Sequence, residues 1–227
     1  MSDAAQAVLW VSLLAGALGA CVVLRRGGVP TTYVRDLLHV GAGAWVVGWP
    51  AWNGWLVPSA ITWVTAAATA SVPLLAPRFA AAAAFRDSVS GGDEVWTGLV
   101  LYTLAFAALT PIGLRGDPFP PAAGLAALCF GDGVGGMIGR RYGRRSFAIP
   151  GAKSKSVEGT LAVALSSAVA IAAVGAWLGR PAGLATSALL GGVAAAAEAL
   201  SPRSSDNLLV PASVFAVALA LDVTGAR

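Results

Sequence analysis

Long apolar stretches alternate with short polar ones along almost the whole chain. Most of the apolar stretches approach the roughly 20 residues that an α-helix needs to cross a bilayer, and Arg, Lys, Pro and Gly mark their ends. The pattern predicts eight membrane-spanning segments, at about residues 4–24, 38–50, 53–76, 95–114, 119–139, 159–179, 182–200 and 207–224. The second is short and the fifth contains Asp132, so a broken helix is an alternative interpretation of either. We expect an all-α, polytopic integral membrane helical bundle with about 7–8 transmembrane helices, forming a single domain over residues 1–227.

The composition agrees with a membrane protein. Of the 227 residues, 57% are hydrophobic and 11% are charged, a balance that soluble domains do not have. The 15 basic and 11 acidic residues give a modest net charge of +4, so we expect no nucleic-acid partner. Cys21 and Cys129 both lie in apolar stretches, and we expect two buried thiols rather than a disulfide or a zinc site. The pattern gives no indication of an oligomeric state.

Positive charge is distributed unevenly between the two predicted sides of the membrane. If all eight segments cross, 12 cations fall on one side and 3 on the other. Because cytoplasmic loops carry the excess of Lys and Arg, the N-terminus is predicted outside, and the main loop, at about residues 140–158, in the cytoplasm. The prediction is a multi-pass protein of the cell membrane. The tryptophans of the outer turn are expected at the membrane interface, where amphipathic rings are favoured; they are Trp45, Trp49, Trp52 and Trp55.

Four acidic residues lie within or at the ends of predicted spans, all toward the cytoplasmic side. They are Asp132, Glu158, Glu198 and Asp206. Arg35 and His39, at the start of the second span, lie on the same side. Ionisable groups within spans are costly and by default functional. They predict a site at the cytoplasmic surface of the membrane, whereas a transporter is expected to carry polar groups nearer the bilayer midplane.

Asp132 is the most deeply placed of these acids. It precedes Arg140 by eight residues, or about 12 Å along a helix. Gly131 and Gly133 flank it, so the backbone there can approach a ligand closely. We interpret Asp132 as a metal ligand or a catalytic base. The alternative is a packing Asp in a glycine-rich helix crossing, because the Gly-x-x-x-Gly spacing that begins at Gly135 is typical of packed helices.

Two nucleotide-binding motifs are excluded. The Gly-x-Gly-x-x-Gly sequence that begins at Gly131 matches the dinucleotide fingerprint, but that motif needs a preceding strand in a βαβ unit, which a helical membrane protein does not have. No Walker A sequence occurs in the chain. If phosphate is bound, another arrangement must bind it.

The basic loop and the start of the sixth span offer such an arrangement. Its candidate phosphate-binding residues are Arg140, Arg141, Lys153, Lys155 and Ser156. Free N–H groups and the helix dipole favour an anion at a helix N-terminus, and Glu158 is placed to hold Mg²⁺ against the same phosphates. The alternative is that the cations only set the topology and that Glu158 caps the helix.

Several blocks of residues carry a resemblance to a known family. They are Gly131-Asp-Gly133, Gly139-Arg-Arg-Tyr-Gly143, Lys155-Ser-Val-Glu-Gly159 and, after Glu198, Asp206-Asn207. In this order they resemble the CTP-dependent polyprenol kinase family, which includes phytol, farnesol and dolichol kinases. A weaker resemblance extends to Arg35 and His39, although Asp36 stands where the family usually has lysine.

The resemblance implies a membrane kinase that transfers the γ-phosphoryl group of CTP to the hydroxyl of an isoprenoid alcohol drawn from the bilayer, with Mg²⁺ as cofactor. The implied catalytic residues are Asp132, Lys155 and Glu158. The implied nucleotide-binding residues are Gly131, Gly133, Arg140, Arg141, Lys153, Lys155, Ser156 and Asn207. The implied metal ligands are Asp132, Glu158, Glu198 and Asp206.

Two alternatives have less support. The distantly similar phosphatidate cytidylyltransferases also have an Asp followed by a Lys-x-x-Glu-Gly block, but they transfer a cytidylyl group to a lipid phosphate. They carry a charged signature near the C-terminus that this chain lacks, which favours a kinase over a cytidylyltransferase; a diacylglycerol kinase-like enzyme belongs to the same alternative. The other alternative is a non-catalytic membrane component or a transporter.

Overall fold

Helices make up most of the computed structural model, which describes residues 1–90, 93–149, 154–202 and 204–223. In chain order the helices and strands are α1 (Asp3–Arg26), α2 (Thr31–Gly41), α3 (Ala44–Val47), the 3₁₀ turn η1 (Trp49–Ala51), α4 (Leu56–Leu75), α5 (Ala80–Val89), α6 (Asp93–Arg115), α7 (Phe119–Ala126), the π-helical turn η2 (Ala127–Asp132), α8 (Gly133–Tyr142), β1 (Ser146–Phe147), β2 (Lys155–Ser156), α9 (Val157–Trp177), α10 (Leu184–Leu200) and α11 (Asp206–Val223). The all-α prediction is confirmed apart from the short antiparallel hairpin of β1 and β2.

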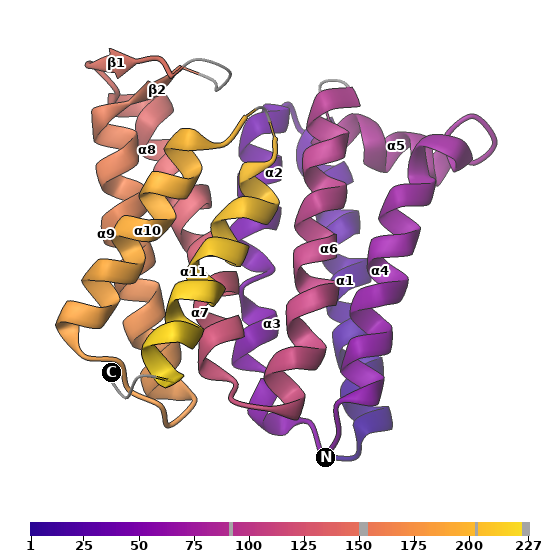
Figure 1. Cartoon of the computed structure of the whole chain (residues 1–227). Helices are drawn as coiled ribbons and strands as arrows, with labels where there is room; N and C mark the ends of the chain where they lie inside the picture. The colour runs from indigo at the N-terminus through magenta and orange to yellow at the C-terminus, as the bar shows by residue number, and fades with distance from the viewer. Residues whose placement is uncertain (91–92, 150–153, 203, 224–227) are drawn as a thin grey trace.

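Successive segments run in opposite directions through the bundle when α2, α3 and η1 are counted as one segment (Figure 1). The β1–β2 hairpin and α5 lie at one end, called here the hairpin end, and α1 starts and α11 ends at the opposite end. The predicted second span is a broken helix made of α2, α3 and η1. Glycines at the breaks let rings pack directly on the backbone: a Cβ at Gly43 would lie 2.7 Å from Phe130, and one at Gly48 would lie 2.2 Å from Trp10.

Five helical segments in the described part of the chain are long and apolar enough to cross a membrane. They are Asp3–Arg26, Leu56–Leu75, Val95–Arg115, Phe119–Tyr142 and Val157–Trp177. The fourth is the continuous rod of α7, η2 and α8. The helices α10 and α11 are apolar but shorter. The chain is therefore a multi-pass helical membrane protein, as its sequence predicts.

The cations divide between the two ends of the bundle as the sequence predicts. The described cations at the hairpin end are Arg25, Arg26, Arg35, Arg78, Arg86, Arg140, Arg141, Arg144, Arg145 and Lys155. Arg115, which ends α6, and Arg180, which follows α9, lie at the opposite end. The predictions for Lys153, Arg203 and Arg227 fall outside the described residues. The uneven distribution is thus a property of the fold and does not depend on an assumed span count.

The tryptophans near the opposite end lie inside the protein rather than at its surface. Trp45, Trp49 and Trp52 are 8%, 2% and 9% exposed and belong to one hydrophobic core cluster. The indole N–H of Trp45 donates to the hydroxyl of Thr110 at 3.0 Å. The prediction of interfacial rings is therefore wrong for these three. Trp55 is nearer the surface, with the guanidinium of Arg115 4.6 Å from its ring centroid.

Helices α8 and α9 approach each other closely because glycines line their contact. A Cβ at Gly135 would lie 2.2 Å from Val163 Cγ2 and 3.2 Å from the carbonyl oxygen of Gly159. A Cβ at Gly139 would lie 3.2 Å from Ser156 Oγ and 3.4 Å from Gly159 Cα. Of the two roles considered for these glycines, the structure favours helix packing.

Adding a methyl group at this contact should destabilise the fold. We expect Gly135→Ala to lower the free energy of unfolding by about 1–3 kcal/mol, the usual cost of overpacking. The measurement is denaturant unfolding of the purified protein in detergent.

Gly192→Ala is the matched control, because a Cβ there meets no atom within 4 Å and alanine is the better helix former. Equal stability of the two variants would contradict the tight α8–α9 contact.

Candidate functional site

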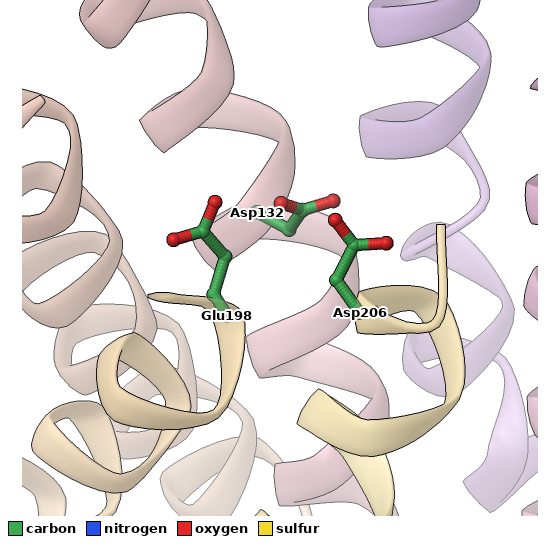
Figure 2. Close-up of side chains that lie close together, drawn as sticks. All are labelled: Asp132, Glu198 and Asp206. Carbon is green, nitrogen blue, oxygen red and sulfur yellow. The ribbon is translucent and has the colours of Figure 1, made fainter. Parts of the chain in front are cut away.

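Three carboxylates from three helices meet near the hairpin end (Figure 2). Asp132 ends η2, Glu198 lies in the last turn of α10, and Asp206 begins α11. One ligand oxygen of each lies within 4.8 Å of the other two. The side chains are 20%, 9% and 15% exposed, in that order. The sequence places these acids at similar depth, and the structure brings them into one group, which we call the acidic cluster.

Two members of the cluster come from a tight helical hairpin. Helix α10 ends at Leu200, and α11 begins six residues later, at Asp206, and runs antiparallel to it. At the end of α10 the hydroxyl of Ser201 donates to the carbonyl of Ala197 at 2.6 Å. Asp206 then lies in the first turn of α11, where the helix dipole favours a negative charge. This short connection brings Asp206 close to Glu198.

The third member, Asp132, is positioned by the π-helical turn and by its flanking glycines. A Cβ at Gly131 would lie 1.9 Å from Ser167 Oγ on α9, and one at Gly133 would lie 2.8 Å from Val40 Cγ2 on α2. Both glycines therefore allow close packing of the neighbouring helices. A π turn inside an α-helix is uncommon and is frequently found at functional sites.

Lys155 supplies a positive charge to the acidic cluster. The hairpin pairs Phe147 with Lys155, and the Lys155 ammonium bonds to Glu198 and lies 3.9 Å from Asp206 Oδ2. Burial by itself lowers the pKa of Lys155, but the negative charges of Glu198, Asp206 and Asp132 outweigh it and raise the pKa above its ordinary value. The amine therefore stays charged at neutral pH, next to the three carboxyl groups of the cluster.

An open cleft of about 510 Å³ lies beside the cluster, between α8, the hairpin and α9. Lys155 and Glu198 line it together with Arg140, Arg144 and Thr160. Its volume is within the range of small-molecule sites. The cleft thus joins the acidic cluster to the most basic loop of the protein.

Arg140 is held at the side of this cleft by an ion pair with Asp36 of α2. The guanidinium folds back along its own helix, so that a Cβ at Gly136 would lie 3.2 Å from Arg140 Nη1. Asp36 is 6% exposed, and its charge is compensated by this pair. The pairing gives a structural role to the acid that stands where the related family usually has lysine.

Two residues predicted for the site have other roles in the fold. Glu158 lies at the surface outside the acidic cluster, and its Oε2 accepts the backbone N–H groups of Arg144 and Arg145 at 3.0 and 3.3 Å. It fixes the basic loop and is not grouped with the three carboxylates as its expected metal role requires. Ser156 is the N-cap of α9, accepting the N–H of Gly159 at 3.1 Å.

The remaining predicted residues lie around the cluster. The amide of Asn207 donates to Ser204 O at 3.4 Å, next to Asp206. Arg141 is exposed, with its guanidinium 5.6 Å from the ring centroid of Tyr142. Lys153 lies outside the described residues.

A second group of residues lies next to Asp132. The sequence pattern does not single out these residues as a unit. The His39 imidazole lies 3.6 Å from Asp132 Oδ2, and the hydroxyl of Tyr102 lies between His39 O and Cys129 Sγ, at 2.7 and 3.1 Å. Their chain positions, on α2, α6 and η2, carry no common spacing. The signal in the sequence is a lone histidine at the predicted cytoplasmic end of a span.

The acidic cluster fits a divalent cation. Carboxylate oxygens are the hard donors that Mg²⁺ takes, and its bonds of about 2.0–2.1 Å need only a small closure of the cluster. Three carboxyl groups within reach of one another also favour a bound cation. The ligands would be Asp132, Glu198 and Asp206.

Fold and site together define a class: a multi-pass membrane protein with an acidic cluster and a basic cleft at the same end of the bundle. The chain is 30% identical to phytol kinase of Synechocystis sp. over 175 residues, which cover 70% of this chain and 68% of that protein. The chain therefore belongs to the phytol kinase and polyprenol kinase family, which confirms the resemblance read from its sequence blocks. No protein-family model matches the chain, and no solved structure matches it.

Removing the Lys155 charge should make the protein depend on a divalent cation for stability. Lys155→Met removes the ammonium group that lies among the three carboxylates. Breaking a largely buried ion pair lowers the free energy of unfolding by about 3–5 kcal/mol. We expect a lower melting temperature than wild type in EDTA, and a larger recovery on adding Mg²⁺ than wild type shows. The measurement is thermal unfolding in detergent, with and without Mg²⁺.

Arg78→Met is the control, since Arg78 is an exposed cation at the same end of the bundle. An unchanged melting temperature for Lys155→Met, or a Mg²⁺ response equal to that of Arg78→Met, would contradict the proposed charge balance.

Proposed function

We propose that this protein is a CTP-dependent kinase that transfers the γ-phosphoryl group to the hydroxyl of an isoprenoid alcohol. The observation that carries the proposal is the meeting of Asp132, Glu198 and Asp206 with Lys155 at the basic end of a membrane bundle. The similarity to phytol kinase supports an isoprenoid alcohol as the acceptor. CTP as the donor is supported by the sequence blocks that resemble the polyprenol kinases.

The basic cleft is the proposed site of the triphosphate. Its lining combines arginines, Lys155 and Glu198 with glycines of α8. Arginine and lysine side chains bind phosphate oxygens through charge-assisted hydrogen bonds. A nucleotide here would have its terminal phosphates near the acidic cluster and its base toward the surface.

In this proposal, Asp132, Glu198 and Asp206 would hold Mg²⁺, which when bound would supply charge neutralisation for the phosphates. The alcohol oxygen forms a bond to the γ-phosphorus while the bond from that phosphorus to the β–γ bridging oxygen breaks, leaving CDP. Because the transition state is loose, the hydroxyl proton leaves late and passes to water. The protein residues therefore act chiefly by positioning and by charge, and Lys155 is a cation that lies directly at the acidic cluster.

The acceptor hydroxyl is proposed to reach the cluster from the bilayer along α11. Leu208 and Leu209 follow Asp206 and Asn207 at the start of α11 and are 40% and 41% exposed. An alkyl chain lying against such leucines remains in hydrocarbon while its hydroxyl stays at the depth of Asp206, so no part of the tail needs to enter water.

The direct test is an assay with CTP labelled at either the γ or the α phosphorus, offered with phytol, geranylgeraniol, diacylglycerol and phosphatidate. Label from the γ position in phytyl or geranylgeranyl phosphate supports the proposal. Label from the α position in lipid indicates a cytidylyltransferase, and γ label in diacylglycerol alone indicates a different lipid kinase. Absence of lipid label from either position contradicts an enzymatic role with these substrates.

Asp132→Asn should reduce phosphoryl transfer by at least about 100-fold, the scale expected when preorganised charge at a reaction centre is lost. The size of the side chain is kept, so the variant should remain folded. The measurement is turnover under saturating CTP and alcohol, with the melting temperature recorded in parallel.

Asp87→Asn is its control, because Asp87 is exposed on α5 at the same end of the bundle. Activity of Asp132→Asn within a few-fold of this control would remove Asp132 from the mechanism.

We also propose that the hairpin end faces the cytoplasm, since positive charge is retained on that side. Single cysteines at Ser146 in β1 and at Gly183 before α10 would report opposite ends of the bundle. An impermeant maleimide added to intact cells should label Gly183→Cys and leave Ser146→Cys unlabelled until the cells are opened. The native thiols, Cys21 and Cys129, are buried, and the reverse labelling pattern would overturn this orientation.

A further inference from the structure

The π-helical turn that ends at Asp132 receives a hydrogen bond from outside its own helix. His39 Nε2 lies 2.9 Å from the carbonyl oxygen of Leu128, within η2. A carbonyl oxygen can only accept, so Nε2 carries the proton and donates. A side chain that bonds into the backbone ladder of a helix is a recognised cause of local distortion. The imidazole thus contacts η2 at the point where the helix widens.

His39 is itself fixed by Tyr102 of α6. The Tyr102 hydroxyl donates to the backbone carbonyl of His39 at 2.7 Å, one of the last carbonyls of α2, which helix geometry leaves without an intrahelical partner. The centroids of the two rings are 4.2 Å apart. Since the phenol proton is used in this bond, the Cys129 thiol is the donor in its 3.1 Å contact with Tyr102 Oη. Cys129 lies in η2, so α2 and α6 both bond to the π-helical turn.

The same imidazole nitrogen lies beside the functional carboxylate. His39 Nε2 is 3.6 Å from Asp132 Oδ2, and Leu128 and Asp132 are four residues apart, about one turn along the rod. The His39 side chain is only 12% exposed, so its bonds are screened little by solvent. If η2 relaxed to an ordinary α-helix, Asp132 would rotate relative to Glu198 and Asp206.

We propose that His39 is a positioning residue for Asp132: its Nε2–H bond to the Leu128 carbonyl holds η2 in its π-helical form, so that the Asp132 carboxylate faces Glu198 and Asp206. The inference deepens the proposed function and rests on it for the role of the acidic cluster. His39 does not touch the reacting atoms in this proposal; it acts through the helix that carries Asp132.

Two substitutions separate the hydrogen bond from the ring. His39→Phe keeps a ring to pack against Tyr102 but has no donor, whereas His39→Gln keeps an N–H donor at the reach of Nε2 and has no ring. The probe is Mn²⁺, whose binding to the purified protein in nanodiscs, without nucleotide or alcohol, is measured by electron paramagnetic resonance. The loss of a group that orients a metal ligand typically weakens metal affinity about 10–100-fold, which is the effect expected for His39→Phe, while His39→Gln should stay within about threefold of wild type.

Thr110→Val is the matched control for the loss of a buried hydrogen bond. Thr110 lies on α6 like Tyr102, is fully buried, and accepts its bond from Trp45 far from the cluster. Its Mn²⁺ affinity should equal that of wild type. Tyr102→Phe keeps the imidazole and tests the same network if His39→Phe fails to fold; it should weaken Mn²⁺ binding by less than His39→Phe does.

The outcomes are distinct. Wild-type Mn²⁺ affinity in both His39→Phe and Tyr102→Phe overturns the inference. Equal weakening of Mn²⁺ binding in His39→Phe and His39→Gln also overturns it, because the N–H donor would then not be the relevant feature. In turnover assays the inference requires His39→Phe to lower kcat while KM for the alcohol stays unchanged. If wild type binds Mn²⁺ and His39→Phe weakens that binding, but no alcohol is phosphorylated, the positioning role stands and the proposed function fails.

Discussion

Mutual repulsion of three carboxylates, largely removed from water at one end of a membrane bundle, is the constraint on which the rest of the site depends. Asp132, Glu198 and Asp206 repel one another when they are ionised, so positive charge beside them stabilises the group. Lys155 provides it from a hairpin rather than from a helix. The hairpin in turn has to be fixed in place, and Glu158 does so by accepting two backbone N–H groups of the basic loop. A residue outside the cluster therefore contributes to its electrostatics indirectly.

Close helix packing is the second requirement, because a carboxylate has a short reach. The cluster forms only if the rod of α7, η2 and α8 comes near both α10 and α11, with α9 packed against it. Glycine makes this possible at Gly131 and Gly135, where an added methyl group would meet atoms of Ser167 and Val163. The same residue type that suggests a ligand-binding loop in the sequence is used here to bring backbones together, and the open side of α8 is what forms the cleft.

Much of the fold could be predicted from the sequence, because the membrane restricts it strongly. Apolar length sets the spans, and Lys and Arg set their direction, so the alternating bundle and its basic end follow directly. The sequence predicts that Asp132, Glu198 and Asp206 lie at a similar depth in the membrane, but it does not predict that they meet. The order of the helices around the bundle is not encoded in hydropathy. Glu158 and Trp45 show where prediction from sequence stops. An acid next to a phosphate-type motif has the same sequence signature whether or not it faces a ligand. A ring near a predicted interface has the same signature whether it faces lipid or the protein interior. The π turn could not be predicted at all, because its partners lie on α2 and α6.

The residues of the site and the residues that support them lie in different halves of the chain. Residues 116–118, between α6 and α7, separate them. All members of the acidic cluster, Lys155 and the cleft-lining arginines lie after this connection, whereas His39, Asp36 and Tyr102 lie before it. Among the described residues, the second half thus carries the acidic cluster and the arginines of the cleft, and the first half supplies side chains that bond to them. If the chain were cut at this connection, one fragment would carry the acidic cluster and the other would carry the residues that position it. The geometry of the site would return only when the two fragments reassociate.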